Sequence, residues 1–171
     1  MDFKDILTKR YSVRKFQDVP VKNSDAGSIL EAGRNAPTAG NKQPQRIIVV
    51  SKKEGLSKID ACTPCRFGAP LVLIVCYDKT ASWVRKFDGE NSGLVDASIA
   101  ACQMMFRAWE LGVGSTWVMH FDPQILRKNF NLSESLIPAA LLVMGYTAPD
   151  ASPADMHWLR NPIEKIASFE E

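Results

Sequence analysis

The sequence predicts an α+β domain in which a mixed β-sheet is flanked by helices. Its 171 residues are 46% hydrophobic and 23% charged, which is an ordinary globular composition, and one domain is expected over residues 1–171. Segments rich in β-branched and other apolar residues alternate with amphipathic segments. Because this alternation is not a regular βαβ series, a mixed sheet is favoured over a purely parallel one.

The first half of the chain contains short segments with clear helical or extended character. Asn23 or Ser24 can cap exposed N–H groups at the start of a helix. β-branched residues in RIIVV and an apolar run in APLVLIVCYD favour strands. The expected elements are helices at 2–9, 24–35 and 53–62, an extended segment at 12–17, and strands at 46–50 and 69–78.

The second half begins with the stretch that has the strongest helical character. GLVDASIAACQMMFRAWELG, at 93–112, is apolar on most sides, which is typical of a central helix, and Gly112 provides its stop. Asp122 and Pro123 are a cap and a first-turn residue for another helix. The remaining expected elements are a strand at 115–120, that helix at 122–130, a strand at 139–146, a loop at 147–162 and a short helix from about 162.

Charge and hydropathy exclude two classes of partner. A net charge of +2 without a long basic run gives no reason to expect nucleic-acid binding. The opening MDFKDILTKR is charged where a signal peptide would be apolar, and no stretch approaches the roughly 18 to 20 apolar residues of a membrane span. We therefore expect a cytoplasmic protein with no membrane contact.

The spacing of the cysteines is compatible with a functional dithiol or with an ordinary pair in a loop. Cys62 and Cys65 form CTPC, a spacing found in redox dithiols and in half-sites for zinc. Neither His120 nor His157 has the usual spacing of a zinc ligand, so no metal site is expected. The pair follows a helix-like segment and precedes a strand-like one, which is the reverse of the usual redox arrangement. An ordinary loop pair is favoured over redox chemistry.

Two segments carry candidate ligand-binding residues. In KRYSVRKF, alternation places Arg10, Ser12 and Arg14 on one face of an extended segment. Such a face is suited to a phosphate or an electron-rich ring edge, although a solvated basic face has the same pattern. In GRNAPTAGNKQP, at 33–44, a hydroxyl and amides could meet a heterocycle, or the segment could simply end a helix. The residues alone leave both alternatives open.

Four motifs in order resemble the flavin-dependent nitroreductase family. They are RYSVRKF, APTAGNKQP, ELGVGSTWV after an Ala-rich helix, and LLVMGY before a Pro-rich tail, and together they span nearly the whole chain. The resemblance implies an α+β fold with a mainly antiparallel sheet. It also implies an intertwined homodimer with FMN at the subunit interface, completed by a loop from the other subunit.

The resemblance assigns roles to individual residues. Arg10 and Ser12, with Tyr11 between them, match positions at the FMN phosphate, and Arg14 matches one at the pyrimidine edge of the flavin. The partner-subunit loop corresponds to Pro37, Thr38, Ala39, Asn41 and Gln43. The strand end at the flavin N5 edge corresponds to Trp117, Met119 and His120. No catalytic side chain is required, because the flavin carries the hydride chemistry, and His120 is only a candidate proton donor.

The chain departs from the family pattern in its tail. Family members often carry two basic residues one position apart before a Pro, whereas WLRNP provides Arg160 and places Trp158 at the first position.

Two aromatic residues are candidates for the substrate pocket. Trp83 and Phe87 are four residues apart, so they would share a face if the segment is helical. They could cover the flavin, or they could simply pack in the core. LGVGS lacks the third glycine of a Rossmann fingerprint and follows a helix, so it is not a nicotinamide-binding motif. The family resemblance implies that NAD(P)H stacks on the flavin itself.

These observations predict an FMN-dependent oxidoreductase. It would take hydride from NADH or NADPH and reduce nitroaromatic, quinone-like or related small-molecule acceptors by a ping-pong mechanism. The alternatives are a flavin-binding or storage protein without turnover, and a thiol redox protein that uses Cys62 and Cys65.

Overall fold

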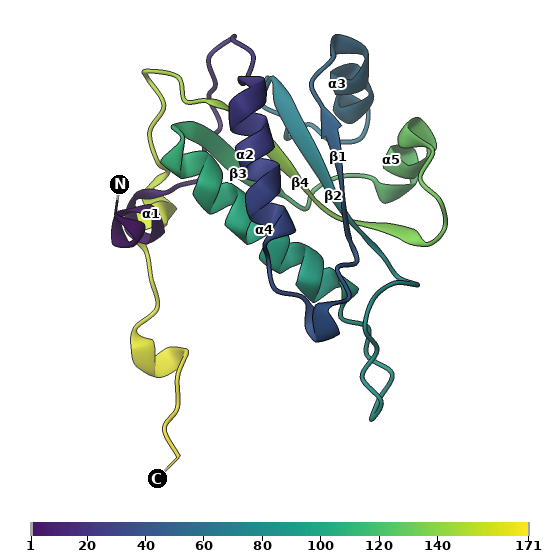
Figure 1. Cartoon of the computed structure of the whole chain (residues 1–171). Coiled ribbons are helices and arrows are strands. Elements are labelled where there is room, and N and C mark those ends of the chain that lie inside the picture. Colours follow the sequence, from purple (N-terminus) through teal and green to yellow (C-terminus); the bar gives the residue numbers. More distant parts are fainter. Residues whose placement is uncertain (1, 171) are drawn as a thin grey trace.

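Four strands form one antiparallel sheet in the order β1-β2-β4-β3 (Figure 1). The computed structural model describes residues 2–170, so the two ends of the predicted domain, residues 1 and 171, lie outside the described part. The strands are β1 (Gln45–Val50), β2 (Leu71–Asp78), β3 (Val113–Val118) and β4 (Leu136–Tyr146).

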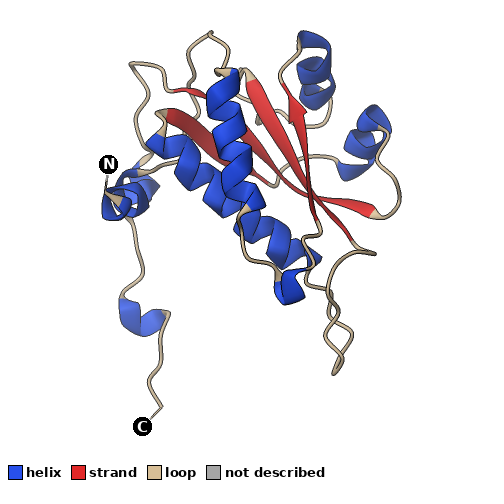
Figure 2. Ribbon diagram, viewed as in Figure 1, coloured by secondary structure: helices blue, strands red, loops and turns tan. Residues whose placement is uncertain are grey.

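Helices cover both faces of this sheet (Figure 2). α2 and α4 pack on one face, and α3 and α5 pack on the other. The helices are α1 (Phe3–Lys9), α2 (Asn23–Arg34), α3 (Lys53–Asp60), α4 (Gly93–Glu110) and α5 (Pro123–Phe130). Short 3-10 turns occur at Ala39–Asn41, Asp155–Trp158 and Ile163–Lys165.

β2 is buried on both faces, which explains its uninterrupted apolar sequence. Leu71, Leu73 and Val75 belong to the core beneath α2 and α4. The alternate residues Val72 and Ile74 belong to the second core, beneath α3 and α5. Since successive side chains of a strand point to opposite faces, a central strand covered on both sides is apolar at every position.

α4 approaches the sheet closely at its first residue. A Cβ on Gly93 would lie 2.1 Å from Cδ2 of Tyr77 and 2.5 Å from Oγ of Ser82. Only glycine therefore fits at the start of this helix without a shift of its neighbours. Gly112, with φ 76°, follows the helix as its sequence predicted.

Several predicted boundaries require correction. α2 begins after Lys22, and its first turn has no side-chain cap, so the predicted capping by Asn23 or Ser24 is wrong. β4 begins at Leu136 and pairs with the end of β2 through a register shift at Val75/Cys76. The expected C-terminal helix is only a 3-10 turn, Ile163–Lys165, in an exposed arm. Local propensity without burial does not sustain a longer helix.

The predicted strand at 115–120 is displaced by two residues. β3 ends at Val118, where its pairing with β4 ends at Leu141, and Met119 and His120 lie beyond it. Beyond the end of this strand, the His120 carbonyl accepts a 2.5 Å hydrogen bond from Thr63 Oγ1. By contrast, Asp122 caps α5 as predicted, since its carboxylate accepts from the N–H groups of Gln124 and Ile125.

The segment at 12–17 is extended but joins the sheet only through isolated bridges. Ser12 pairs with Ser115 in the parallel sense, and Phe16 pairs with Thr147 in the antiparallel sense. The sheet is therefore mainly antiparallel, as the family resemblance implied. Within residues 2–170, no helix combines the length and hydropathy needed to span a membrane.

Candidate functional site

The N-terminal extended segment and the C-terminal tail form the walls of one cavity of about 330 Å³. We call it the arginine cavity. It contains three guanidinium groups, and no Asp or Glu lines it among the residues that the structure describes. Such a site favours an anionic group that accepts several charge-assisted hydrogen bonds. The lining residues are Arg10, Tyr11, Ser12, Arg14, Ala154, Met156, His157 and Arg160.

Packing of Val13 orients the N-terminal side of this cavity. Val13 is fully buried, and its N–H donates a 3.0 Å hydrogen bond to the carbonyl of Ser115. Because neighbouring side chains of an extended segment alternate, the residues on either side, Ser12 and Arg14, face outward into the cavity. The alternation seen in the sequence therefore does bring Arg10, Ser12 and Arg14 to one place.

Arg10 has a buried donor without a partner. Its Nε is inaccessible to solvent and makes no hydrogen bond among the described residues. A buried unsatisfied donor costs about 1 to 3 kcal/mol, and more when the group is charged. The Arg10 guanidinium is thus held in a position where an additional acceptor would stabilise it.

Tyr11 contacts the C-terminal tail at residues that precede Arg160 in the chain. Tyr11 Oη donates a 3.4 Å hydrogen bond to the Ala151 carbonyl, and its ring meets His157 edge-on at a centroid distance of 6.1 Å. Burial raises the pKa of Tyr11. Arg160 Nη1 donates to the carbonyls of His157 and Leu159, the latter at 2.7 Å.

Trp158, which stands where family members often carry a basic residue, does not line the arginine cavity. Its side chain is 68% exposed and stands against the His157 ring, with centroids 4.5 Å apart, outside the lining of the arginine cavity. The guanidinium of Arg14 is instead the third positive charge in that cavity. The departure in the tail therefore leaves three cations around one space.

The loop at 37–43 has a specialised backbone conformation. Gly40, Asn41 and Gln43 all have positive φ, at 57°, 54° and 49°. For residues other than glycine this left-handed conformation is uncommon and unfavourable, so surrounding contacts must maintain it. The Gln43 N–H donates a 3.0 Å hydrogen bond to Thr38 Oγ1, and Gln43 Nε2 donates a 3.1 Å bond to Asn41 Oδ1.

Asp96 connects this loop to α4, and the sequence did not single it out. Its side chain is buried, with 2% exposed. Oδ1 accepts a 2.9 Å hydrogen bond from the Ala39 N–H, and Oδ2 accepts a 2.7 Å bond from Ser92 Oγ. An acidic residue inside the most apolar helix of the chain was the available signal, because such groups are rarely buried without partners.

A second cavity, of about 380 Å³, lies between the loop, α4 and the excursion between β2 and α4. We call it the loop cavity. Pro37, Thr38 and Ala39 form one wall, and the excursion contributes Trp83 among other residues. A Cβ on Gly40 would lie 3.3 Å from Trp83 Cδ1, so the indole packs directly against the loop backbone.

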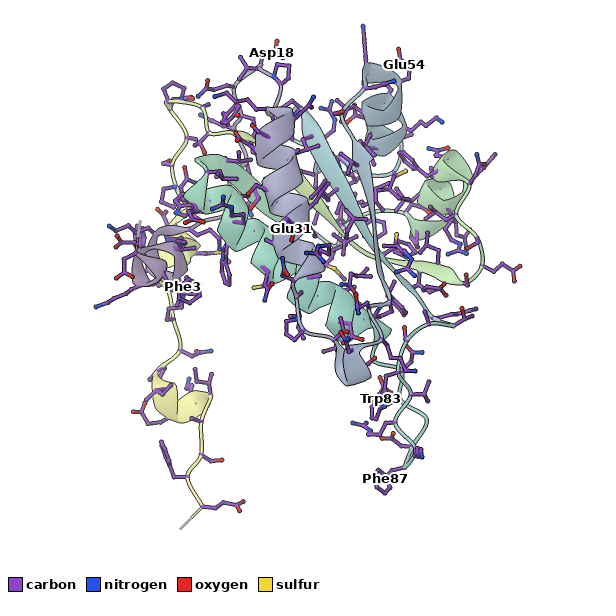
Figure 3. All side chains as sticks on the ribbon, viewed as in Figure 1. Phe3, Asp18, Glu31, Glu54, Trp83 and Phe87 are labelled. Carbon is purple, nitrogen blue, oxygen red and sulfur yellow. The ribbon has the colours of Figure 1, made fainter. Side chains whose placement is uncertain are left out.

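The excursion is a projecting hairpin instead of a helix (Figure 3). Val84 bridges to Asn91 in the antiparallel sense. Trp83 lies at the base, whereas Phe87 lies at the tip and is 98% exposed. The two aromatic residues therefore do not share a face, and only Trp83 lines the loop cavity.

The residues after β3 form a third group. The Trp117 ring packs partly buried against the core beneath α2 and α4, while Met119 and His120 are exposed. None of these three described residues lines the arginine cavity. One chain therefore does not bring together all the residues that the resemblance assigns to a single flavin.

The sequence pattern of the nitroreductase family matches residues 7–63 and 64–146. The chain belongs to the nitroreductase family. It is 41% identical to a nitroreductase family protein of Clostridium difficile, whose structure superposes with a TM-score of 0.92 over 100% of this chain and 99% of that one. The α+β fold predicted from the resemblance is thereby confirmed.

One further relative supports the assignment to this family, and one further structure supports the fold. A 30% identical protein of Methanothermobacter thermautotrophicus, named for NADH dehydrogenase and NAD(P)H nitroreductase, matches 91% of this nitroreductase family chain and 83% of its own length. A protein of Exiguobacterium sibiricum, crystallised in complex with FMN, has the same fold with a TM-score of 0.87 at 20% identity. That likeness covers 99% of this chain and 98% of the other.

Cys62 of this nitroreductase family member has the properties of a core residue. Cys62 is buried, its Sγ donates a 3.1 Å hydrogen bond to the Lys58 carbonyl, and burial raises its pKa. Cys62 and Cys65 are both free thiols. A redox cysteine instead requires a lowered pKa and access to its partner. The local geometry therefore favours the loop-pair reading.

Cys76 provides a pH-dependent test of this core. Burial in β2 raises the pKa of Cys76 to about 12, whereas the thiol of an unfolded chain has a pKa of about 8.5. Between those values the unfolded state binds fewer protons than the folded state, so stability falls as the pH rises. Between about pH 8 and 10, wild type should lose about 2 kcal/mol more than Cys76→Ala in urea unfolding. Equal losses in both proteins would contradict this assignment.

Proposed function

We propose that this chain is an FMN-dependent oxidoreductase that takes hydride from NADH or NADPH and reduces nitroaromatic, quinone-like or related acceptors in a ping-pong cycle. The observation that carries the proposal is the arginine cavity with its unpartnered Arg10 donor, in a chain of the nitroreductase family. The relative named for NAD(P)H nitroreductase and the fold neighbour crystallised with FMN support the choice of hydride donor and cofactor.

The residues of the arginine cavity fit the phosphate of FMN. A phosphate presents several anionic acceptor oxygens, and Arg10 Nε is a buried donor that lacks an acceptor. Ser12 adds a hydroxyl, and Arg160 brings a third group from the tail. We assign these three residues, with Tyr11 supporting the tail, to the phosphate, and we assign Arg14 to the pyrimidine edge of the ring.

When bound, FMN supplies the hydride and electron transfer itself, so the chain needs only to bind, orient and polarise it. A positive charge from Arg14 near the ring favours added negative charge on that ring. Trp117, Met119 and His120 are proposed to border the flavin mainly through backbone, because the Trp117 ring is occupied in the core. His120 is exposed, which leaves its imidazole available as a proton donor.

A homodimer would unite the parts that a single chain separates. The arginine cavity and the loop cavity have no lining residue in common, and Figure 1 shows α1 and the C-terminal arm on the opposite side of the α2–α4 pair from the hairpin. The arm also leaves the body with large apolar side chains 59% to 87% exposed, namely Trp158, Leu159, Ile163, Ile166 and Phe169. Exposed apolar surface of this kind indicates an interface. We propose that Pro37, Thr38, Ala39, Asn41 and Gln43 of one copy complete the flavin site of the other.

The spectrum of the purified protein tests the function. Yellow protein that NADH or NADPH bleaches without oxygen, and that a quinone or nitroarene then recolours, is the expected result. Cys62→Ser should bleach and recolour at the wild-type rate, because Cys62 lies in the core. Yellow protein inert to both nicotinamides would instead indicate flavin storage. Colourless protein whose activity is lost in Cys62→Ser would indicate thiol chemistry.

A further inference from the structure

We propose that Trp83 and Glu90 determine which electron acceptors this chain reduces, and that they select flat aromatic acceptors without negative charge, bound in the loop cavity. This inference rests on the proposed flavin function. It goes beyond it by assigning the acceptor to one cavity and by naming the side chains that discriminate among acceptors.

The position of the loop cavity makes it suitable for the acceptor. Pro37, Thr38 and Ala39 form one of its walls, and these are residues proposed to meet the flavin. A molecule in the cavity would therefore adjoin the proposed flavin contact. Its volume of about 380 Å³ lies at the small end of ligand sites, which suits a compound of one or two rings.

The wall that contains Trp83 is held rigidly. Asp96 binds the Ala39 N–H on one side and the Ser92 hydroxyl on the other. The Ser92 N–H in turn donates a 2.9 Å hydrogen bond to the Trp83 carbonyl. The indole itself rests against Gly40. A fixed aromatic surface loses little entropy when it binds a second ring, so it favours planar ligands.

The remaining walls add apolar surface. Val95 and Ile99, from the first turns of α4, line the cavity with Trp83. Val95 is 60% exposed and Trp83 is 38% exposed, so both retain surface that a ligand could cover. A flat apolar molecule would bury these groups together and gain stabilisation in proportion to the area removed from water.

The charges around the cavity disfavour anions. The Arg85 guanidinium is engaged by both oxygens of Asp88, at 2.8 and 2.6 Å. The carboxylate of Glu90, which also lines the cavity, has no ion pair within 4.0 Å among the described residues. Arg85 also attracts Glu90 at longer range, but the lining has one cationic residue, Arg85, against two acidic residues, Glu90 and Asp96, so its net charge is negative. A carboxylated or sulfonated acceptor would therefore meet repulsion.

The test uses FMN-loaded protein that dithionite has reduced without oxygen, mixed rapidly with nitrobenzene or with nitrobenzoate. Reoxidation of the flavin gives a second-order rate constant for each acceptor. Comparing variants on the same compound cancels the difference in intrinsic reactivity between the two compounds. Because dithionite replaces NAD(P)H, the acceptor step is measured independently of the hydride donor.

Trp83→Ala should lower the rate constant for flavin reoxidation about tenfold with both acceptors. Trp83→Phe should recover most of that loss, since it retains an aromatic face. Glu90→Gln should raise the rate constant for reoxidation by nitrobenzoate about three- to tenfold, and it should change the rate constant for nitrobenzene by less than about twofold. Phe87→Ala is the matched control from the same hairpin, and it should leave both rates unchanged because Phe87 does not line the cavity.

Two results would overturn the inference: Trp83→Ala rates equal to those of Phe87→Ala, or a nitrobenzoate-to-nitrobenzene ratio that Glu90→Gln does not alter. Each variant is compared at equal FMN content, so that loss of cofactor is not mistaken for loss of acceptor binding. Wild-type protein that NAD(P)H does not reduce would contradict the proposed function instead, and the dithionite measurement would still decide the roles of Trp83 and Glu90.

Discussion

Arg10→Ala is expected to weaken FMN binding by about ten- to hundredfold, because a hydrogen bond to a charged group is worth about 1.5 to 3 kcal/mol. The structure gives this residue a particular reason to matter. Its Nε is already buried and lacks a partner, so much of the cost of ordering the group has been met before a ligand arrives. Fluorescence titration of flavin-free protein with FMN measures the change.

The neighbouring Lys9 provides the matched control. It is also cationic and lies in the same stretch of chain, but it pairs with Asp5 on α1 at 2.9 Å and does not line the arginine cavity. Lys9→Ala should alter FMN affinity by less than about twofold, which is the level expected for an exposed charge. Equal effects of Lys9→Ala and Arg10→Ala would mean that only the general positive field acts, and not a site built around Arg10.

Mixing two inactive variants is expected to restore activity if the flavin site is shared between subunits. One protein carries Arg10→Ala with Arg14→Ala, and the other carries Asn41→Ala with Gln43→Ala. In a mixed dimer, the intact N-terminal segment of the second protein meets the intact loop of the first. One complete site and one doubly defective site result, so flavin binding and activity should recover to about half of wild type per heterodimer.

The controls for this experiment distinguish recovery that depends on mixed dimers from recovery of either variant by itself. Each variant incubated alone should remain inactive, and mass measurement of the intact assembly should establish that mixed dimers have formed. Alanine at 41 and 43 also disfavours the left-handed conformation of the loop, so melting curves must show that the fold is retained. Mixed dimers without recovery would show that each subunit builds its own cleft, and the proposed role of the loop would be wrong.

The sequence by itself determined the features that depend on local patterns. Apolar periodicity and β-branched runs located the strands and the central helix, and Asp122 followed by Pro123 marked the start of α5. Alternation in KRYSVRKF predicted a shared face for Arg10, Ser12 and Arg14, and all three line the arginine cavity, although Tyr11 between them lines it as well. Four ordered motifs were also enough to identify the family.

Tertiary structure decided everything that depends on what a residue meets across the chain. Burial of Asp96 against the Ala39 N–H joins residues 57 positions apart, and no local pattern contains that contact. Trp83 and Phe87 look equivalent in sequence, yet a hairpin places one against Gly40 and the other in solvent. β3 likewise ends at Val118, the last of its residues paired with β4, and this pairing is between segments far apart in the sequence. Such outcomes follow from long-range pairing and burial, whose energies exceed the local preferences that a sequence pattern records.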